Sequence, residues 1–297
     1  MYLSSTKINQ LLGRDVSLPS TKYYLGLSNS QQPGTLSFCD TEKFIREIEK
    51  NENVTALFVT EAITQKVTAT AIKLIETEDP RYDFYYLINE AGKENYKEFK
   101  SEIHPSAKIH DRAYVADNNV KIGANTIVEP NVTILPDVEI GKNCIIRAGS
   151  VIGSEGFEQK RTQKGILAVL HFGKVIINDN VHLGALNSVA KGMSFRDTIV
   201  GDSTRTDNLV HIAHGVQIGK RCFLPASCMI AGSVTVEDDV WIGPNCSISS
   251  GITIKKNAFI TIGAVVTRTV EEGQTVSGNF AIPHQKFLRN LKNSLND

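Results

Sequence analysis

The sequence predicts a mainly β protein built around a parallel β-helix, with a small α/β domain before it and a short helix after it. Three observations support this prediction: an aliphatic residue recurs every six positions, the recurrence breaks twice, and the first 100 residues lack it. A period of six fits neither the 3.6 of a helix nor the alternation of a single strand. It is the period of a solenoid whose coil has three short faces, one hexapeptide to a face.

The six-residue ladder runs through residues 101–280, the predicted β-helix. Its aliphatic positions are Ile109, Val115, Ile122, Val128, Ile134, Ile140, Ile146, Ile152, Ile177, Leu183, Val189, Ile212, Ile218, Leu224, Ile230, Val236, Ile242, Ile248, Ile254, Ile260 and Val266. One coil is therefore 18 residues long. Residues 18 positions apart are equivalent on adjacent coils, so their side chains should stack on one another.

The position four residues after each aliphatic should also point inward, and it carries small residues. Four of the five cysteines fall there: Cys144, Cys222, Cys228 and Cys246. We expect them to be interior fillers rather than nucleophiles or metal ligands. The odd count and the absence of a CxxC pair favour reduced thiols.

The period is lost at residues 153–173 and 190–198. Insertions in a solenoid become loops that project from one edge, and such loops commonly carry function.

Residues 1–100 predict a separate α/β domain. Residues 35–40, 56–61 and 71–79 read as strands, and residues 41–51 read as a helix. At the other end, residues 281–297 form a tail whose helical spacing predicts a short terminal cap.

Charge and hydropathy exclude several classes of function. Lys plus Arg and Asp plus Glu number 32 each, so no global field draws the protein to nucleic acid or to an anionic membrane. The sequence has no apolar run long enough to span a membrane and no secretory signal at its start, which predicts a cytoplasmic protein.

His214 is the strongest candidate for catalysis. It lies two positions after the inward-pointing Ile212, and Gly232 follows it by one full coil. A histidine with a backbone N–H beside it suits acyl transfer, which needs a general base and a donor for the developing oxyanion. The alternatives are a surface histidine, a purely structural solenoid, and a zinc site, for which a third ligand beside His211 and His214 is not evident.

The segments GSEGF (153–157), 172–185, 197–219 and IAGS (230–233) resemble the UDP-3-O-acylglucosamine N-acyltransferases of lipid A synthesis. The resemblance implies a left-handed β-helix, a homotrimer with active sites between subunits, and a bacterial cytoplasmic enzyme. It implies that His214 is the base and that the Gly232 amide faces the thioester carbonyl. It also implies that Asp207, Asn208 and His211 contact substrate, and that Phe38 and Phe44 sandwich the nucleotide base.

Three differences from that family shape the expected function. Gly251 occupies the place of a second histidine, Phe44 replaces a tyrosine, and only 19 residues follow Gly278. We therefore expect an N-acyltransferase that uses acyl-CoA or acyl carrier protein to acylate a nucleotide-linked amino sugar, with no metal and no permanently bound cofactor. The narrower alternative is the lipid A enzyme itself, and a non-catalytic trimeric scaffold is a third.

Overall fold

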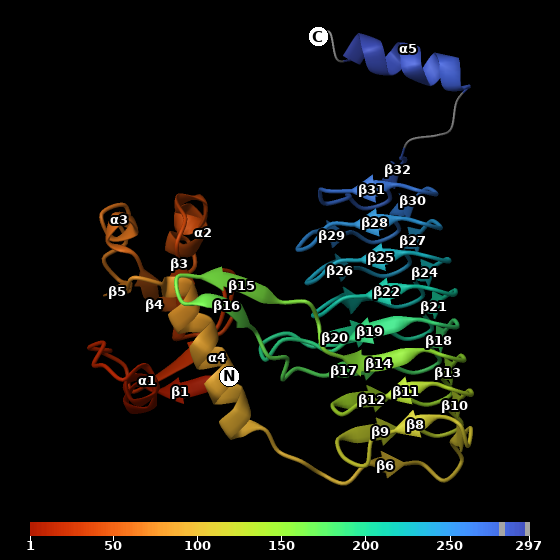
Figure 1. Ribbon diagram of the computed structural model, residues 1–297, viewed down its shortest axis with the longest axis horizontal. Coiled ribbons are helices and arrows are strands. Elements are labelled where there is room, and N and C mark those ends of the chain that lie inside the picture. Colours follow the sequence, from red (N-terminus) through yellow and green to blue (C-terminus); the bar gives the residue numbers. More distant parts are fainter. Residues whose placement is uncertain (279–282, 295–297) are drawn as a thin grey trace.

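The computed structural model describes residues 1–278 and 283–294, in which an α/β unit stands beside a long β-solenoid (Figure 1). The α/β unit has one five-stranded sheet in the order of the chain. Its strands are β1 (Tyr2–Ser4), β2 (Lys22–Leu25), β3 (Thr35–Cys39), β4 (Val54–Val59) and β5 (Lys73–Glu76), of which β1 and β2 are antiparallel and the rest parallel. Its helices are α1 (Ser5–Leu12), η1 (Glu42–Phe44), α2 (Ile45–Glu49), α3 (Glu61–Thr64) and α4 (Pro80–Asn95).

Helix α4 was not expected from the sequence, although its start signal is present. Asp79 caps it by accepting a hydrogen bond from the Tyr82 backbone N–H at 2.9 Å, and Pro80 occupies its first turn. Phe84, Leu87 and Ile88 of α4 are fully buried in the core of the unit. The helix thereby covers the sheet and carries the chain to the solenoid (Figure 1).

The solenoid is a left-handed parallel β-helix with three sheets, each strand pairing with its equivalent one coil away. The first sheet holds β7 (Lys108–Ile109), β10 (Ile127–Val128), β13 (Ile145–Ile146), β18 (His182–Leu183), β21 (Arg205–Thr206), β24 (Phe223–Leu224), β27 (Trp241–Ile242), β30 (Phe259–Ile260) and β32 (Thr275–Val276). The second holds β8 (Tyr114–Val115), β11 (Thr133–Ile134), β14 (Val151–Ser154), β19 (Ser188–Ala190), β22 (His211–Ile212), β25 (Met229–Ile230), β28 (Ser247–Ile248) and β31 (Val265–Val266). The third holds β6 (Glu102–Ile103), β9 (Val120–Ile122), β12 (Val138–Ile140), β17 (Val175–Ile177), β20 (Thr198–Val200), β23 (Gln217–Ile218), β26 (Thr235–Val236) and β29 (Thr253–Ile254).

The interior of the solenoid is the predicted aliphatic ladder. Ile134, Ile146 and Ile212 are fully buried, and the equivalent residues of the other coils form one continuous cluster with them. The four repeat cysteines lie inside the same cluster. Their thiols donate to backbone carbonyls, as Cys222 does to the Glu237 carbonyl at 3.1 Å. Burial raises the pKa of Cys222 and Cys228 to about 11, which agrees with a packing role.

Each corner of a coil needs one residue with positive φ, and asparagine often supplies it. Asn125, Asn131 and Asn143 have φ between 56° and 59°, six or twelve residues apart. Asparagine tolerates this left-handed region better than most residues, so its recurrence follows from the turn geometry.

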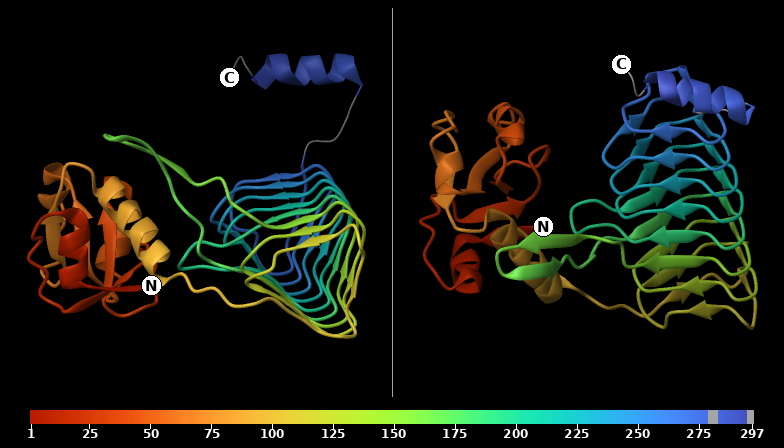
Figure 2. Two further views of the ribbon diagram at one scale, coloured as in Figure 1. Left: turned by 60° about the horizontal axis from the view of Figure 1, so that its bottom comes forward. Right: turned by 45° about the horizontal axis from the view of Figure 1, so that its top comes forward.

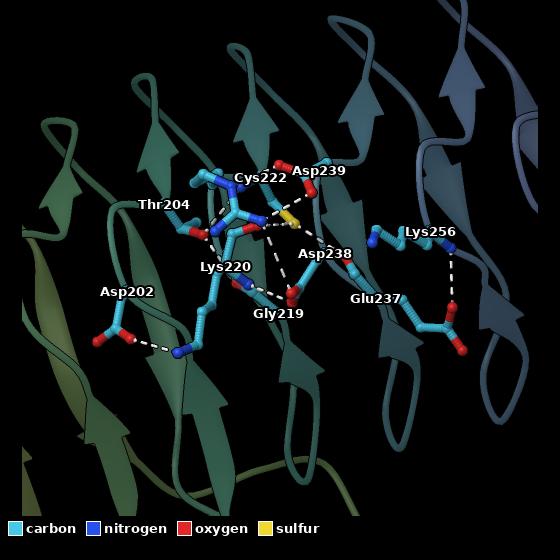
Figure 3. A network of polar contacts seen from close by, with 10 residues as sticks. Asp202, Thr204, Gly219, Lys220, Cys222, Glu237, Asp238, Asp239 and Lys256 are labelled. Atoms are coloured by element: carbon cyan, nitrogen blue, oxygen red, sulfur yellow. Dashed lines mark hydrogen bonds and ion pairs between the residues drawn. The ribbon is translucent and has the colours of Figure 1, made fainter.

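At the corner between the third and first sheets, acidic side chains bind the backbone of a neighbouring coil (Figure 3). Asp238 accepts a hydrogen bond from the Lys220 N–H at 2.8 Å, and Glu237 accepts one from the Lys256 N–H at 2.8 Å. These bonds satisfy turn N–H groups that the sheets leave unpaired.

Both insertions leave the solenoid at the corner between the second and third sheets, which we call the insertion corner. The first, between β14 and β17, contains the antiparallel hairpin β15 (Gln159–Thr162) and β16 (Gly165–Ala168). The second, between β19 and β20, spans residues 191–197. Figure 2 shows the hairpin reaching the α/β unit.

Side-chain contacts fix the hairpin to helix α4. Asn89 donates to the Ala168 carbonyl at 2.8 Å and accepts from the Leu170 N–H at 2.9 Å. Val169 and Met193, one from each insertion, are buried in the core of the α/β unit. The insertions therefore join the two parts of the molecule.

The tail forms helix α5 (His284–Ser294), within the predicted range. It does not form the expected cap within the chain, because Leu288 stays exposed and Figure 1 shows α5 apart from the last coil. The helix carries Lys286, Arg289 and Lys292 beside the leucines at 288 and 291, so it is amphipathic.

Candidate active site

His214 lies at the insertion corner, directly after β22, under the loop of the first insertion. Its side chain is only 12% exposed. A Cβ built on Gly156 would lie 2.7 Å from the His214 Cβ and 2.6 Å from the His171 Nε2. The first insertion therefore passes so close to both imidazoles that only glycine fits at position 156.

Gly232 packs against the imidazole of His214, as the coil length predicted. A Cβ at position 232 would lie 2.5 Å from the His214 Nε2, so any side chain there would displace the ring. Within the described residues, the Gly232 N–H has no hydrogen-bond acceptor. An unpaired amide beside a histidine can stabilise an oxyanion that forms next to that histidine.

The nearest carboxylate to His214 comes from the first insertion. The Glu158 Oε2 lies 3.2 Å from the His214 Nε2, and Glu158 also pairs with Lys160. The His214 Nδ1 is buried and has no protein partner among the described residues. The imidazole is thus held mainly by packing, with one carboxylate at the nitrogen that faces Gly232.

A second buried histidine lies beside the first. The rings of His171 and His214 meet edge to face with centroids 5.3 Å apart, and His171 is 1% exposed. The Nδ1 of His171 lies 3.0 Å from Glu155, whose other oxygen contacts the Lys191 Nζ at 3.0 Å. A line of polar side chains therefore runs from His214 along the insertion corner.

The electrostatics favour a neutral His214. Burial lowers its pKa; Glu158 opposes this effect, whereas His171 and Lys160 add to it. Burial alone would raise the pKa of Glu155, but the contacts with His171 and Lys191 lower it to about 2. At neutral pH the site therefore holds an ionised Glu155 and an imidazole able to accept a proton.

Three other predicted site residues lie away from the insertion corner. Asp207 and Asn208 lie at the corner between the first and second sheets, where Asn208 accepts the Ala185 N–H at 2.8 Å. His211 lies on β22 and is exposed as a residue. Its imidazole ring is partly buried, and this burial lowers the pKa of His211. Within one chain Asp207 and Asn208 do not join His214.

The two predicted base-stacking aromatics lie in the α/β unit. The Phe38 ring packs on Phe84 and Tyr85, with centroids 5.1 and 5.5 Å away. Phe44 is exposed in η1, and the Lys43 Nζ lies 5.6 Å from its ring centroid. The ring contacts of the described residues do not join Phe38 to Phe44, so their shared role stays a prediction.

Gly251, at the place of the family's second histidine, borders open space. A Cβ built there meets nothing within 4 Å, and its φ is +72°. The described residues therefore leave space for the first atom of a side chain at this position.

Sequence reasoning missed Glu155, Glu158, His171 and Lys191. A usable signal existed: both insertions begin just after Ile152 and Val189, and His214 follows Ile212 in the same way. Counting coils would have placed the two insertions and His214 at one corner.

The described part of the chain has no group of three or more His, Cys, Asp or Glu side chains arranged to hold a metal ion. In the same residues, no helix is long and apolar enough to cross a membrane.

Comparisons with known proteins agree with the fold. Residues 119–154 match the family model "Bacterial transferase hexapeptide (six repeats)", and residues 215–240 and 233–268 match "Hexapeptide repeat of succinyl-transferase". Among solved structures, the UDP-N-acetylglucosamine acyltransferase from Campylobacter jejuni aligns with a TM-score of 0.50 at 21% identity. The alignment covers 60% of this chain and 72% of that one. This likeness supports the β-helix.

Curated relatives carry the name predicted from the sequence. The chain is 36% identical over 150 residues to a UDP-3-O-acylglucosamine N-acyltransferase from Caulobacter sp., covering 50% of this chain and 44% of that protein. It is 33% identical over 164 residues to the protein of that name from Wolinella succinogenes, covering 55% and 51%. The match thus spans about half of the relatives' length. These names agree better with the narrower lipid A alternative than with the broader main expectation.

Proposed function

We propose that the protein transfers an acyl group from a thioester to the amine of a UDP-linked amino sugar. One observation carries the proposal: a neutral, buried His214 packs against Gly232, whose N–H has no acceptor in the described chain. Because the relatives are named UDP-3-O-acylglucosamine N-acyltransferases, a UDP-3-O-acylglucosamine is the first acceptor to test.

The geometry supports a direct displacement. The sugar amine attacks the thioester carbonyl while the His214 imidazole, packed against Gly232, accepts a proton from the attacking nitrogen. The carbonyl oxygen gains negative charge and accepts a hydrogen bond from the Gly232 N–H. The C–S bond then breaks, and the imidazolium returns the proton to the leaving thiolate. The products are an amide and a thiol, and no enzyme nucleophile is needed.

The first insertion would set the basicity of His214. The Glu158 carboxylate lies 3.2 Å from the His214 Nε2, and its charge stabilises the imidazolium. His171 closes the other side of the ring and limits its rotation. The acyl donor in this proposal is acyl-CoA or acyl carrier protein, and both end in the same thioester.

We also propose that the active unit is a homotrimer. Leu186 and Leu209 are 59% and 56% exposed at the corner between the first and second sheets, and Phe223 and Phe259 on the first sheet are also exposed. This apolar edge is a candidate surface for a second copy. Such contact would bring Asp207 and Asn208 of one subunit towards the His214 of another.

The test is release of free thiol with purified protein. UDP-3-O-acylglucosamine and other UDP- and dTDP-linked amino sugars are offered with short-chain acyl-CoA and, in parallel, with acyl carrier protein. We expect His214→Ala to lower kcat/KM by about 10²–10⁴-fold, the usual contribution of a general base.

His110→Ala is the matched control, because His110 is a partly exposed histidine that directly follows β7 in the first coil. It should keep full activity. Thiol release by His214→Ala at more than about a tenth of the wild-type kcat/KM would exclude the general-base role. If no free thiol is released with any acceptor and donor, the result would favour the non-catalytic trimeric scaffold.

A further inference from the structure

A cavity of about 450 Å³ lies beside the candidate active site, between the α/β unit and the insertion corner. The α/β unit contributes Tyr24, Asn29 and Gln32, and the solenoid contributes Arg196, Gln217 and Ser233. Its volume falls within the range of small-ligand sites. Most of these groups are polar and uncharged, and Arg196 is the one cation among the described lining residues.

Arg196 belongs to the second insertion and is incompletely paired. Its Nε donates to the Gly215 carbonyl at 2.6 Å, and its Nη2 donates to the Thr235 Oγ1 at 2.9 Å. A guanidinium has five N–H donors, so three remain without an acceptor in the described residues. Neither partner is a carboxylate, and no described acidic group forms an ion pair with Arg196.

Such an arrangement is costly for a structural cross-link alone. The guanidinium is half-buried, and burial lowers the pKa of Arg196. A partly desolvated charge is normally balanced by an opposite charge. Asp197, the adjacent residue, accepts the Lys174 N–H at 2.7 Å and is not paired with Arg196.

The position of Arg196 connects the cavity to the chemistry. Gly215, which accepts its Nε bond, is the residue after His214, and Ser233 follows Gly232. The cavity and Arg196 therefore border the backbone residues that directly follow His214 and Gly232.

We infer that Arg196 and this cavity form a binding site for the diphosphate of a nucleotide ligand. The planar fork of a guanidinium matches phosphate oxygens, and neutral amide and hydroxyl groups complete the shell without repelling them. The two sources of that chemistry are the UDP of the acceptor and the diphosphate of coenzyme A. Naming these two ligands rests on the proposed function, whereas the anion site rests on Arg196 itself.

Calorimetric binding of UDP, uridine and coenzyme A to the full chain tests the inference without turnover. We expect Arg196→Gln to weaken the binding of either UDP or coenzyme A by about 10–100-fold. This loss of affinity is typical of hydrogen bonds to a charged group. Uridine, which lacks phosphate, should be unaffected. The ligand whose affinity falls identifies the source of the diphosphate. Arg196→Lys should bind that ligand with an affinity between those of the wild type and Arg196→Gln.

Thr235→Val provides the matched control, because it removes one acceptor of Arg196 and keeps the guanidinium. It should bind UDP and coenzyme A within about threefold of wild type, as a loss of one neutral hydrogen bond allows. The inference is overturned if Arg196→Gln and Arg196→Lys, with wild-type melting temperatures, bind both ligands unchanged. It is also overturned if Thr235→Val loses as much affinity as Arg196→Gln.

The outcome is separate from that of the acyl-transfer assay. Phosphate binding that depends on Arg196, without thiol release, leaves the site standing and the proposed function rejected. Thiol release that depends on His214, with unchanged UDP and coenzyme A binding in both Arg196 variants, rejects only the anion site.

Discussion

At the scale of single residues, the environment of His214 decides what this protein can do. Four charged or titratable side chains act on the pKa of its imidazole, and of these only Glu158 raises it; the other three are His171, Lys160 and His211. Burial has the largest effect and lowers the pKa by disfavouring the imidazolium, and Lys160 adds to it. The balance keeps the base neutral near pH 7, while Glu158 keeps it basic enough to accept a proton.

Glu158→Gln tests this balance. Removing the carboxylate charge destabilises the imidazolium, so the pKa of His214 should fall further. The base then stays deprotonated to lower pH, and the acid limb of the pH profile of kcat/KM should move to lower pH. The plateau should also fall, because a weaker base accepts the amine proton less readily.

The comparison variant is Glu129→Gln, which removes a carboxylate that pairs with Arg147 on another corner. Its profile should overlay that of the wild type. An acid limb that stays in place or moves upward in Glu158→Gln would show that Glu158 does not set the proton affinity of His214.

At the scale of the coil, glycine and acidic side chains act together at the corner between the third and first sheets. Gly219 lies under the corner of the next coil, and a Cβ there would be 2.5 Å from the Asp238 Oδ1 and 2.7 Å from the Glu237 carbonyl carbon (Figure 3). Gly141 has the same relation to Asp179. The close approach lets each carboxylate reach the backbone N–H of the coil below.

Gly219→Ala should therefore destabilise the solenoid. The added methyl meets backbone as well as the carboxylate, so the coils must separate locally, and overpacking of this kind typically costs about 1–3 kcal/mol. Urea unfolding followed by circular dichroism measures the change in the free energy of unfolding.

Lys220→Ala is the neighbouring control. It removes only the exposed ion pair between the Lys220 Nζ and Asp202, 3.0 Å apart, and such pairs contribute about 0–1 kcal/mol. Equal stability of Gly219→Ala and the wild type would mean that the coils tolerate a wider spacing at this corner.

At the scale of the whole molecule, two leucines occupy left-handed corner positions that polar residues or glycine fill in most other coils. Leu186 and Leu209 have φ of 57° and 61°, and both side chains are exposed. The left-handed conformation costs a branched L-residue about 1–2 kcal/mol. More than half of each side chain stays exposed in the described chain, and burial against another copy would offset that cost.

Leu209→Asp should therefore disrupt the proposed homotrimer. A charge at the centre of an apolar contact is strongly unfavourable unless it is paired, so the mass from light scattering should fall from three chains towards one. Thiol release should fall with it, if Asp207 and Asn208 act across the interface.

The control introduces the same charge elsewhere: Lys121→Asp changes an exposed position on the third sheet, away from the apolar edge. It should leave the mass unchanged. A wild-type protein that is monomeric at micromolar concentration, or a Leu209→Asp variant that remains a trimer, would contradict the proposed assembly.

The sequence predicted the solenoid because its signal is periodic and local. Ile122, Ile134 and Ile146 each mark the interior of one short strand, and three such strands close a coil of fixed length. The same 18-residue spacing predicts the contact between Gly232 and His214 that the structure shows. Helix α4 was missed, because its apolar residues cover the sheet over a broad face and show weak helical spacing, although Asp79 and Pro80 mark its start.

The sequence by itself determined the repeating interior, the length of the coil and the pairing of His214 with Gly232, since each depends on residues at fixed spacing. Only the tertiary structure decided what surrounds that pair. Glu158, His171 and Arg196 lie in insertions outside the period, and their positions depend on how those loops fold against helix α4 and the corner. Contacts between segments far apart in the chain carry no periodic signal, so the groups that tune the base could be found only in the folded molecule.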